Sequence, residues 1–321
     1  MDEKSCLVVG DAVVDLIVQF PRFLNEERTD VEYPSPCMQG GGTSANTAVA
    51  LARLGIPTSF LGTVGDDQYG RYVAEDFRKE GVGTEQLIIS PSLYTICVFA
   101  FIDERGERYL WGWPREKQAF KEIDFDKIDF DSVRKAAWVH SSGMAIVHDS
   151  SSRHSILRIM REAHDAGVPT SFDLNLRVNR GNMDEAYRTA VLEAIKYSNY
   201  VLGSGNDEFY YLGPCSDWRD SARSFVTPTR TVVARMGEEG SMAMTPDQTM
   251  IEKPFPVQVV DTVGAGDAYN AGFIAARLAG RPLRDCLVWG NAVSSYKVAH
   301  KGARSTPSTS ELDDFMKSHG H

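Results

Sequence analysis

The residues best suited to chemistry lie in one short stretch, Asp261–Asp267 (D-T-V-G-A-G-D), followed by an alanine-rich run to Gly280. The segment Val257–Val260, with three β-branched valines, predicts a strand, and small residues at helical spacing predict a helix from Ala265. A glycine-containing turn that opens a helix can direct backbone N–H groups at an anion. Asp267 falls in the first turn, where a carboxylate could remove a hydroxyl proton while the turn holds a phosphoryl group. An ordinary loop before a helix with an acidic first turn has the same spacing, so the residues alone leave both open.

This segment resembles the C-terminal signature, D-T-x-G-A-G-D, of the ribokinase-like (PfkB) carbohydrate kinases. The resemblance implies an ATP-dependent kinase in which Asp267 is the catalytic base. It also implies that the anion-binding turn is formed by Gly264, Ala265 and Gly266.

A second candidate region lies near the N-terminus. Asp15 stands between apolar residues of a predicted strand, where an unpaired buried carboxylate is costly, so a functional role is favoured there. The glycine-rich segment Gly40–Asn46 resembles the N-terminal signature of the same family. The resemblance implies that Gly41 and Gly42 let the substrate approach the backbone, and that Asp15 and Asn46 bind sugar hydroxyls.

Substrate choice rests on fewer residues. Asp173, Asn175 and Arg177 follow a predicted strand at alternate positions, where α/β sheets place ligand groups, and they resemble a D-x-N-x-R stretch of fructokinases and ketodeoxygluconate kinases. Arg115 lies near the position of an arginine in that branch. Two converging arginines would suit a carboxylate or phosphate. The alternative is that Arg115 is solvated and Arg177 only orders its loop.

The resemblance also implies a nucleotide site and ion sites. Nucleotide-side positions are Ser204, Arg235, Gly237, Gly240 and Asn291. Asp207 is the expected magnesium-side acid, because Ser204 and Asp207 stand where many relatives have N-x-x-E. A monovalent cation, K⁺, is expected at Asp261, Val263 and Gly302. The cofactors expected are therefore ATP and Mg²⁺, with K⁺ as an activator.

Composition excludes several other classes. The chain has 321 residues and a net charge of −10, from 34 basic and 44 acidic side chains, which disfavours a nucleic-acid partner. No apolar run approaches a membrane span, and the first residues lack the layout of a signal peptide. The five cysteines are widely spaced without C-x-x-C, which favours a reduced, cytoplasmic protein.

The elements predict an α/β fold with a central, mostly parallel sheet and helices on both faces. Strands and helices alternate from about residue 130 onward, which is typical of βαβ units. We expect a single ribokinase-like kinase domain over residues 1–321. A small β-sheet, called the lid, is expected from about 14–34 and 94–112. By resemblance, the lid closes over the sugar and pairs two subunits in a homodimer.

The function predicted is transfer of the γ-phosphoryl group of ATP to a primary hydroxyl of a ketose or sugar acid. The chain lacks the P-loop pattern and a complete dinucleotide-binding fingerprint. A nucleoside or ribose kinase of the same family is the alternative, and a catalytically silent sugar-sensing protein is the non-enzyme alternative.

Overall fold

The computed structural model describes residues 5–19, 34–103, 105, 107–179, 181–213 and 217–320. Its main sheet has ten strands, in the order β14-β13-β12-β11-β10-β9-β1-β4-β5, and β6 also pairs with β4. The pairings are parallel except for those of β13 and β14, which close one edge as an antiparallel hairpin. The strands are β1 Cys6–Val9, β4 Thr58–Gly65, β5 Val82–Gly83, β6 Leu87–Ser90, β9 Trp138–Ser142, β10 Thr170–Asp173, β11 Tyr200–Ser204, β12 Thr231–Arg235, β13 Ser241–Met244 and β14 Thr249–Glu252.

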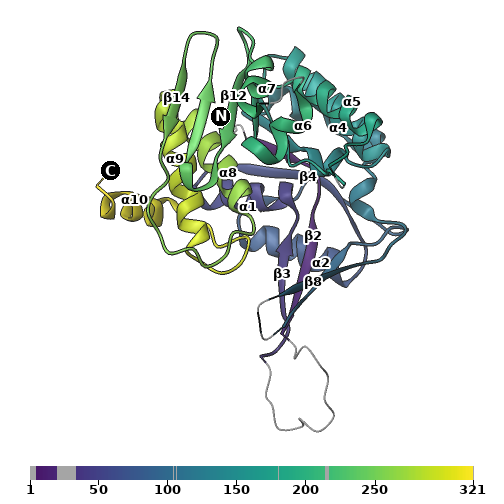
Figure 1. The fold of residues 1–321 in the computed structure, drawn as a ribbon. Coiled ribbons are helices and arrows are strands. Elements are labelled where there is room, and N and C mark those ends of the chain that lie inside the picture. The colour runs from purple at the N-terminus through teal and green to yellow at the C-terminus, as the bar shows by residue number, and fades with distance from the viewer. Residues whose placement is uncertain are drawn as a thin grey trace.

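Helices cover both faces of this sheet, as the sequence predicts (Figure 1). Alternate residues of β1 show this division, because Cys6 and Val8 belong to one buried cluster whereas Leu7 and Val9 belong to another. The first cluster holds α1 Thr43–Arg53, α2 Gln68–Lys79, α8 Ala265–Leu278, α9 Leu283–Val298 and α10 Thr309–Ser318. The second holds α3 Phe130–Lys135, α4 Ser151–Asp165, α5 Glu185–Lys196, α6 Tyr210–Leu212 and α7 Trp218–Ser224. Strands buried on both faces are expected of a parallel sheet.

The lid is a second sheet of four strands in the order β3-β2-β7-β8, and in Figure 1 it extends away from the main body. Its strands are β2 Val13–Gln19, β3 Cys37–Gly41, β7 Cys97–Ile102 and β8 Arg108–Trp113. The predicted lid segment 14–34 includes residues 20–33, which lie outside the described residues. β3 leads into α1 through Gly42, so the lid joins the main body beside the predicted sugar-binding residues.

The predicted strand at Val257–Val260 is wrong. These residues form no strand, and Val259 and Val260 are exposed. The backbone N–H groups of Val260 and Asp261 both donate to the carbonyl of Val298 at the end of α9. The segment is therefore a connection from the hairpin to α8, bonded to a helix terminus, and its β-branched residues are not buried in a sheet.

Candidate active site

The N-terminus of α8 is shaped by Gly264. This residue precedes the helix with φ of 78°, in the left-handed region, and no side chain caps the helix there. A Cβ at Gly264 would lie 2.5 Å from the carbonyl oxygen of Ala303, so only glycine fits. The first N–H groups of a helix have no partner within it, which makes this turn suitable for an anion.

Asp267 lies in the first turn of α8 and is buried, with 6% of its surface exposed. Its Oδ2 accepts a hydrogen bond of 2.9 Å from Nδ2 of Asn46, on α1. Burial raises the pKa of Asp267 to about 7, against the hydrogen bond from Asn46, which lowers it. The nearby carboxylates of Asp173 and Asp11 add to the rise, and the charge of Arg235 opposes it. A carboxylate with a pKa near neutrality is suited to accept and release a proton.

A cavity of about 370 Å³ opens in front of this carboxylate. Most of the predicted substrate and catalytic residues line it: Asp15, Gly42, Asn46, Asn175, Arg177, Gly264, Ala265, Gly266 and Asp267. Gly41 and Arg115 are not among its lining residues, and Arg115 is exposed. A Cβ at Gly41 would collide with the carboxylate of Asp15, so only glycine fits at this position. We call this cavity the sugar-side cavity.

Two acids on its wall have different surroundings. Burial raises the pKa of Asp15 to about 6, and the nearby charge of Arg304 opposes the rise. Asp11 instead accepts hydrogen bonds from the N–H groups of Thr43 and Ser44, at 2.8 and 3.2 Å, and so caps α1. The sequence did not predict this cap, because Asp11 lies on a different element from the helix that it caps.

A second cavity of about 780 Å³, the nucleotide-side cavity, is lined by all the predicted nucleotide-side residues: Ser204, Arg235, Gly237, Gly240 and Asn291. Its apolar wall includes Phe255, Val257, Val259 and Val298. Asn291 Nδ2 donates to the carbonyls of Glu252 and Lys253, at 3.0 and 3.1 Å, and thereby fixes one side of this cavity.

Arg235 is bonded within the protein on several sides. Its guanidinium donates to Asp173 Oδ1 at 2.7 Å, to Asn270 Oδ1 at 2.8 Å and to the carbonyl of Gly266 at 3.3 Å. Glu208 Oε2 lies 3.6 Å away. Arg235 therefore ties the first turn of α8 to the end of β10. Its charge is largely balanced by two buried carboxylates.

The second of these carboxylates, Glu208, is an acid that the sequence did not predict. Residues Gly205–Phe209 form a π-helical turn, which inserts one residue relative to α-helical spacing. Glu208 is buried and accepts from the N–H groups of Ser204 and Leu176, at 2.5 and 2.8 Å. Burial raises the pKa of Glu208, and Asp173 adds to the rise.

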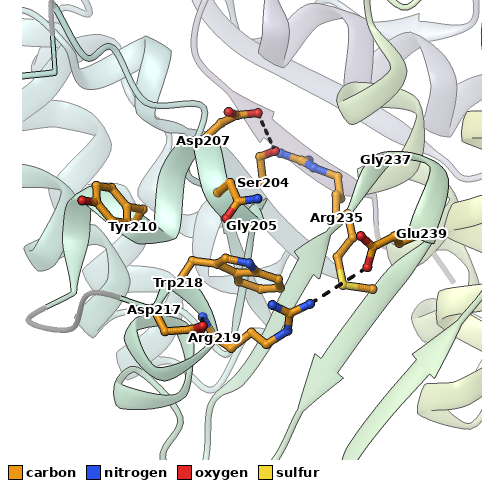
Figure 2. A pocket seen from close by; sticks show the side chains of 12 residues that line it. Ser204, Gly205, Asp207, Tyr210, Asp217, Trp218, Arg219, Arg235, Gly237 and Glu239 are labelled. Carbon is orange, nitrogen blue, oxygen red and sulfur yellow. Dashed lines mark hydrogen bonds and ion pairs between the residues drawn. The ribbon is translucent and has the colours of Figure 1, made fainter.

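Asp207, the predicted metal-side acid, is exposed instead. It lines an adjoining cavity of about 570 Å³ together with Ser204, Trp218, Arg235 and other residues. Figure 2 shows its carboxylate directed at Ser204, whose hydroxyl is 3.4 Å from Asp207 Oδ2. The i, i+3 spacing of the N-x-x-E pattern predicts the second acid at Asp207. The sequence gives no sign of the π-helical turn, whose extra residue places Glu208 beside Arg235.

The residues expected at a monovalent cation are brought together. The carboxylate of Asp261 accepts from the N–H groups of Val263 and Gly302, at 3.1 and 2.9 Å. The carbonyl of Asp261 accepts from Lys297 Nζ at 2.6 Å. Among the described residues, no group of three or more His, Cys, Asp or Glu side chains is placed to hold a metal ion.

A family model described as pfkB family carbohydrate kinase matches residues 3–310. The chain belongs to this family. It is an ATP-dependent sugar kinase, a phosphotransferase that acts on a sugar hydroxyl. In the part of the chain that the structure describes, no helix of this kinase is both long and apolar enough to cross a membrane.

Two relatives match the PfkB kinase over most of their length. An ATP-dependent ribose-1-phosphate kinase of Halopiger xanaduensis is 30% identical, over 97% of each chain. A 5-dehydro-2-deoxygluconokinase of Clostridium perfringens is 31% identical, over 86% of this chain and 83% of its own.

Solved structures share the fold. An E. coli protein described as ribokinase II, in complex with ATP and Mg²⁺, has a TM-score of 0.85 at 19% identity, over 98% of this chain and 100% of its own. A double mutant of the fructokinase of Vibrio cholerae O395, with fructose, ADP and potassium bound, has a TM-score of 0.81 at 27% identity, over 98% of each chain.

Proposed function

We propose that this PfkB kinase transfers the γ-phosphoryl group of ATP to a primary hydroxyl of a sugar acid or ketose. The observation that carries this proposal is that the two cavities meet at α8: Thr262, Ala265 and Gly266 line both. A sugar hydroxyl near Asp267 and the end of a nucleotide would thus approach the same helix N-terminus. Phosphoryl transfer needs mainly such positioning and charge stabilisation.

In this proposal Asp267 accepts the proton of the attacking hydroxyl, while the turn Gly264–Gly266 holds the transferred phosphoryl group through backbone N–H groups. Asp15 and Asn46 bind sugar hydroxyls. Gly237, Gly240 and the apolar wall hold the nucleotide.

The residues near Arg235 fit a magnesium ion on the phosphates. Asp173 is fully buried, and its Oδ2 has no hydrogen-bond partner among the described residues. Mg²⁺ prefers carboxylate and water oxygens. In this proposal Asp173 would hold the ion through Oδ2, and the predicted acid Asp207 would contact it through water. When bound, it neutralises phosphate charge. Potassium is proposed as an activator at Asp261, with the carbonyls of Val263 and Gly302.

A sugar acid is favoured over a neutral sugar by Arg177. It is the one cationic residue among those described that line the sugar-side cavity, and its Nη1 is held by the carbonyls of Asn175 and Leu176, both at 3.2 Å. The similarity to a 5-dehydro-2-deoxygluconokinase supports the same class. The similarity to a ribose-1-phosphate kinase supports a phosphorylated sugar as the second candidate, since a guanidinium binds either oxyanion.

The test compares kcat/KM for 5-dehydro-2-deoxygluconate, 2-keto-3-deoxygluconate, fructose, ribose 1-phosphate, ribose and adenosine. We expect a sugar acid to be best. Arg177→Ala should lower kcat/KM for that acid by about 10- to 100-fold, the worth of hydrogen bonds to a charged group, and change fructose less. Arg115→Ala tests the second predicted arginine, which does not line the sugar-side cavity and should therefore cause a smaller change. Ribose or adenosine as the best substrate would contradict this specificity.

We also propose a cytoplasmic homodimer that pairs through the lid. On β8, Tyr109, Trp111 and Trp113 form an exposed apolar patch on one face of the lid sheet, and Leu110, 69% exposed, lies on the other face. Such a patch is typical of an interaction surface. Sedimentation of the wild type and Trp111→Asp should give a dimer and a monomer; a monomeric wild type would contradict the proposal.

A further inference from the structure

An arginine outside both signatures is built into the sugar side of the site. Arg304 follows Ala303 directly, and only 10% of its side chain is exposed. Its Nη1 forms an ion pair with Asp76 of α2, and its Nη2 donates to the carbonyl of Gly41 at 3.1 Å. A Cβ at Gly40 would collide with the guanidinium, so the end of β3 is shaped to admit Arg304.

The third contact of Arg304 reaches the predicted base through one side chain. Its Nε donates to Asn46 Oδ1 at 3.0 Å, and Asn46 Nδ2 donates to Asp267 Oδ2 at 2.9 Å. An arginine has donors only, so it can face only the oxygen end of the Asn46 amide. That fixes the amide with its nitrogen towards Asp267. The Oδ2 of Asp267 must then act as an acceptor, and the proton taken from the substrate goes to Oδ1.

We propose that Arg304 is a positioning residue for phosphoryl transfer. Anchored by Asp76, it fixes the orientation of the Asn46 amide. The amide nitrogen then keeps Asp267 Oδ2 a hydrogen-bond acceptor and favours the ionised form of the carboxyl group. This inference rests on the proposed role of Asp267 as the base. It assigns to Asn46 a function in holding the base, besides contact with the sugar. A residue from the C-terminal segment thus completes the N-terminal signature.

The charges around these groups make the consequence specific. Asp173 and Asp11 face Asp267 and raise its pKa, whereas Arg235 lowers it. Asp76, Asp15, Glu80 and Tyr72 face Arg304. Without Arg304, the amide can turn its oxygen towards Asp267, and only a protonated carboxyl can bond to that oxygen. The acid limb of the pH profile, the range in which kcat/KM falls as the pH is lowered, would then move to higher pH.

Arg53 provides a matched control, because it also ties α1, α2 and the C-terminal segment together. It donates to both carboxylate oxygens of Glu80, at 2.6 and 2.7 Å, and to the carbonyl of Thr306 at 3.1 Å. None of these contacts involves Asn46. Arg53→Met therefore removes a comparable structural tie without changing the orientation of the amide.

The experiment measures kcat, the pH profile of kcat/KM and the unfolding midpoint for wild type, Arg304→Met, Arg304→Lys, Arg53→Met and Asp267→Asn. The substrates are ATP and the faster of fructose and 5-dehydro-2-deoxygluconate. Arg304→Met should lower kcat by about 10²-fold, the cost of a misplaced reacting group. Its acid limb should rise by about one pH unit, the loss of one bond to a charged group.

The other variants separate positioning from structure. Lysine also has donors only, so Arg304→Lys should restore the acid limb while its unfolding midpoint stays lowered. Arg53→Met should lower the midpoint and leave the acid limb of the wild type. An unchanged acid limb in Arg304→Met, with Asp267→Asn inactive, would make Arg304 purely structural and overturn this inference alone. Near-wild-type turnover by Asp267→Asn would overturn the proposed base, and this inference with it.

Discussion

The two cavities that meet at α8 are built differently. The sugar side carries fixed charges on side chains, with Asp11, Asp15, Arg177 and Asp267 among its lining residues. The nucleotide side has a single acid, Glu238, among its described lining residues, beside Lys253 and Arg235, and much of the rest is glycine, proline and valine; the charge of Arg235 is balanced by Asp173. The difference indicates that sugar-side chemistry depends on protonation and on single side chains. Nucleotide-side binding depends more on the shape of the backbone.

The largest effect should follow from removing the base on the sugar side. Asp267→Asn keeps the size of the side chain and an oxygen that can accept from Asn46, but it cannot take a proton. We expect kcat to fall by about 10²- to 10⁴-fold, with the KM for ATP within about twofold of wild type. Steady-state kinetics and an unchanged unfolding midpoint check this. A variant that loses ATP affinity instead would show that the two cavities are not separable in this way.

Removing the balanced charge between the cavities should affect stability more than chemistry. Arg235→Met leaves the carboxylate of Asp173 buried without its partner, which costs about 3–5 kcal/mol in the free energy of unfolding. Arg219→Met is the exposed counterpart, because Arg219 lies 4.0 Å from Glu239 with 49% of its side chain exposed, and it should cost less than about 1 kcal/mol. Urea unfolding of both variants makes the comparison. Equal losses would mean that the buried pair of Arg235 and Asp173 contributes no more to stability than the exposed pair of Arg219 and Glu239.

The turn shared by both cavities gives a smaller, purely geometric effect. Gly264→Ala and Gly280→Ala each place alanine at a positive φ, at opposite ends of α8. Only Gly264 faces a backbone oxygen, whereas nothing lies within 4 Å of a Cβ at Gly280. We expect Gly264→Ala to lose about 1–3 kcal/mol of stability and to be the slower enzyme, with Gly280→Ala losing about 1 kcal/mol at full activity. Slow turnover by Gly280→Ala would show that α8 transmits strain along its length.

These differences also mark what the sequence could predict. The alternation of strands and helices follows from local periodicity, and the two signatures placed Asn46 and Asp267 in one site. Glu208 was missed because a π-helical turn shifted the inward position by one residue. Arg304 and Asp11 were missed because each acts on an element distant in sequence. Val257–Val260 was predicted as a strand because β-branching cannot distinguish a buried strand from a solvent-facing connection.

A change of pH should affect the sugar side of the site, by about tenfold in kcat/KM, more than it affects ATP binding on the nucleotide side. Asp267 must be ionised to accept a proton, and its pKa is about 7, so kcat/KM for the sugar should be about tenfold lower at pH 6 than at pH 8. Below a pH of about 6 the slope should steepen as Asp15 also becomes protonated. The dissociation constant of ATP, measured by calorimetry without sugar, should change less over the same range. A flat sugar profile would contradict the assignment of the base.

The smallest expected effect concerns potassium. The polar groups of the loop at Asp261 are already bonded within the protein, to the N–H groups of Val263 and Gly302 and to Lys297 Nζ. An ion bound at this loop would only add to the protein contacts that already hold the loop in place. Replacing K⁺ by tetramethylammonium at constant ionic strength should therefore lower kcat only about two- to threefold, which corresponds to less than about 1 kcal/mol in the activation free energy. Lys297→Met removes one of those contacts and should enlarge the dependence on K⁺. Loss of more than about tenfold in the wild type would mean that the ion, and not the protein, holds the anion-binding turn in place.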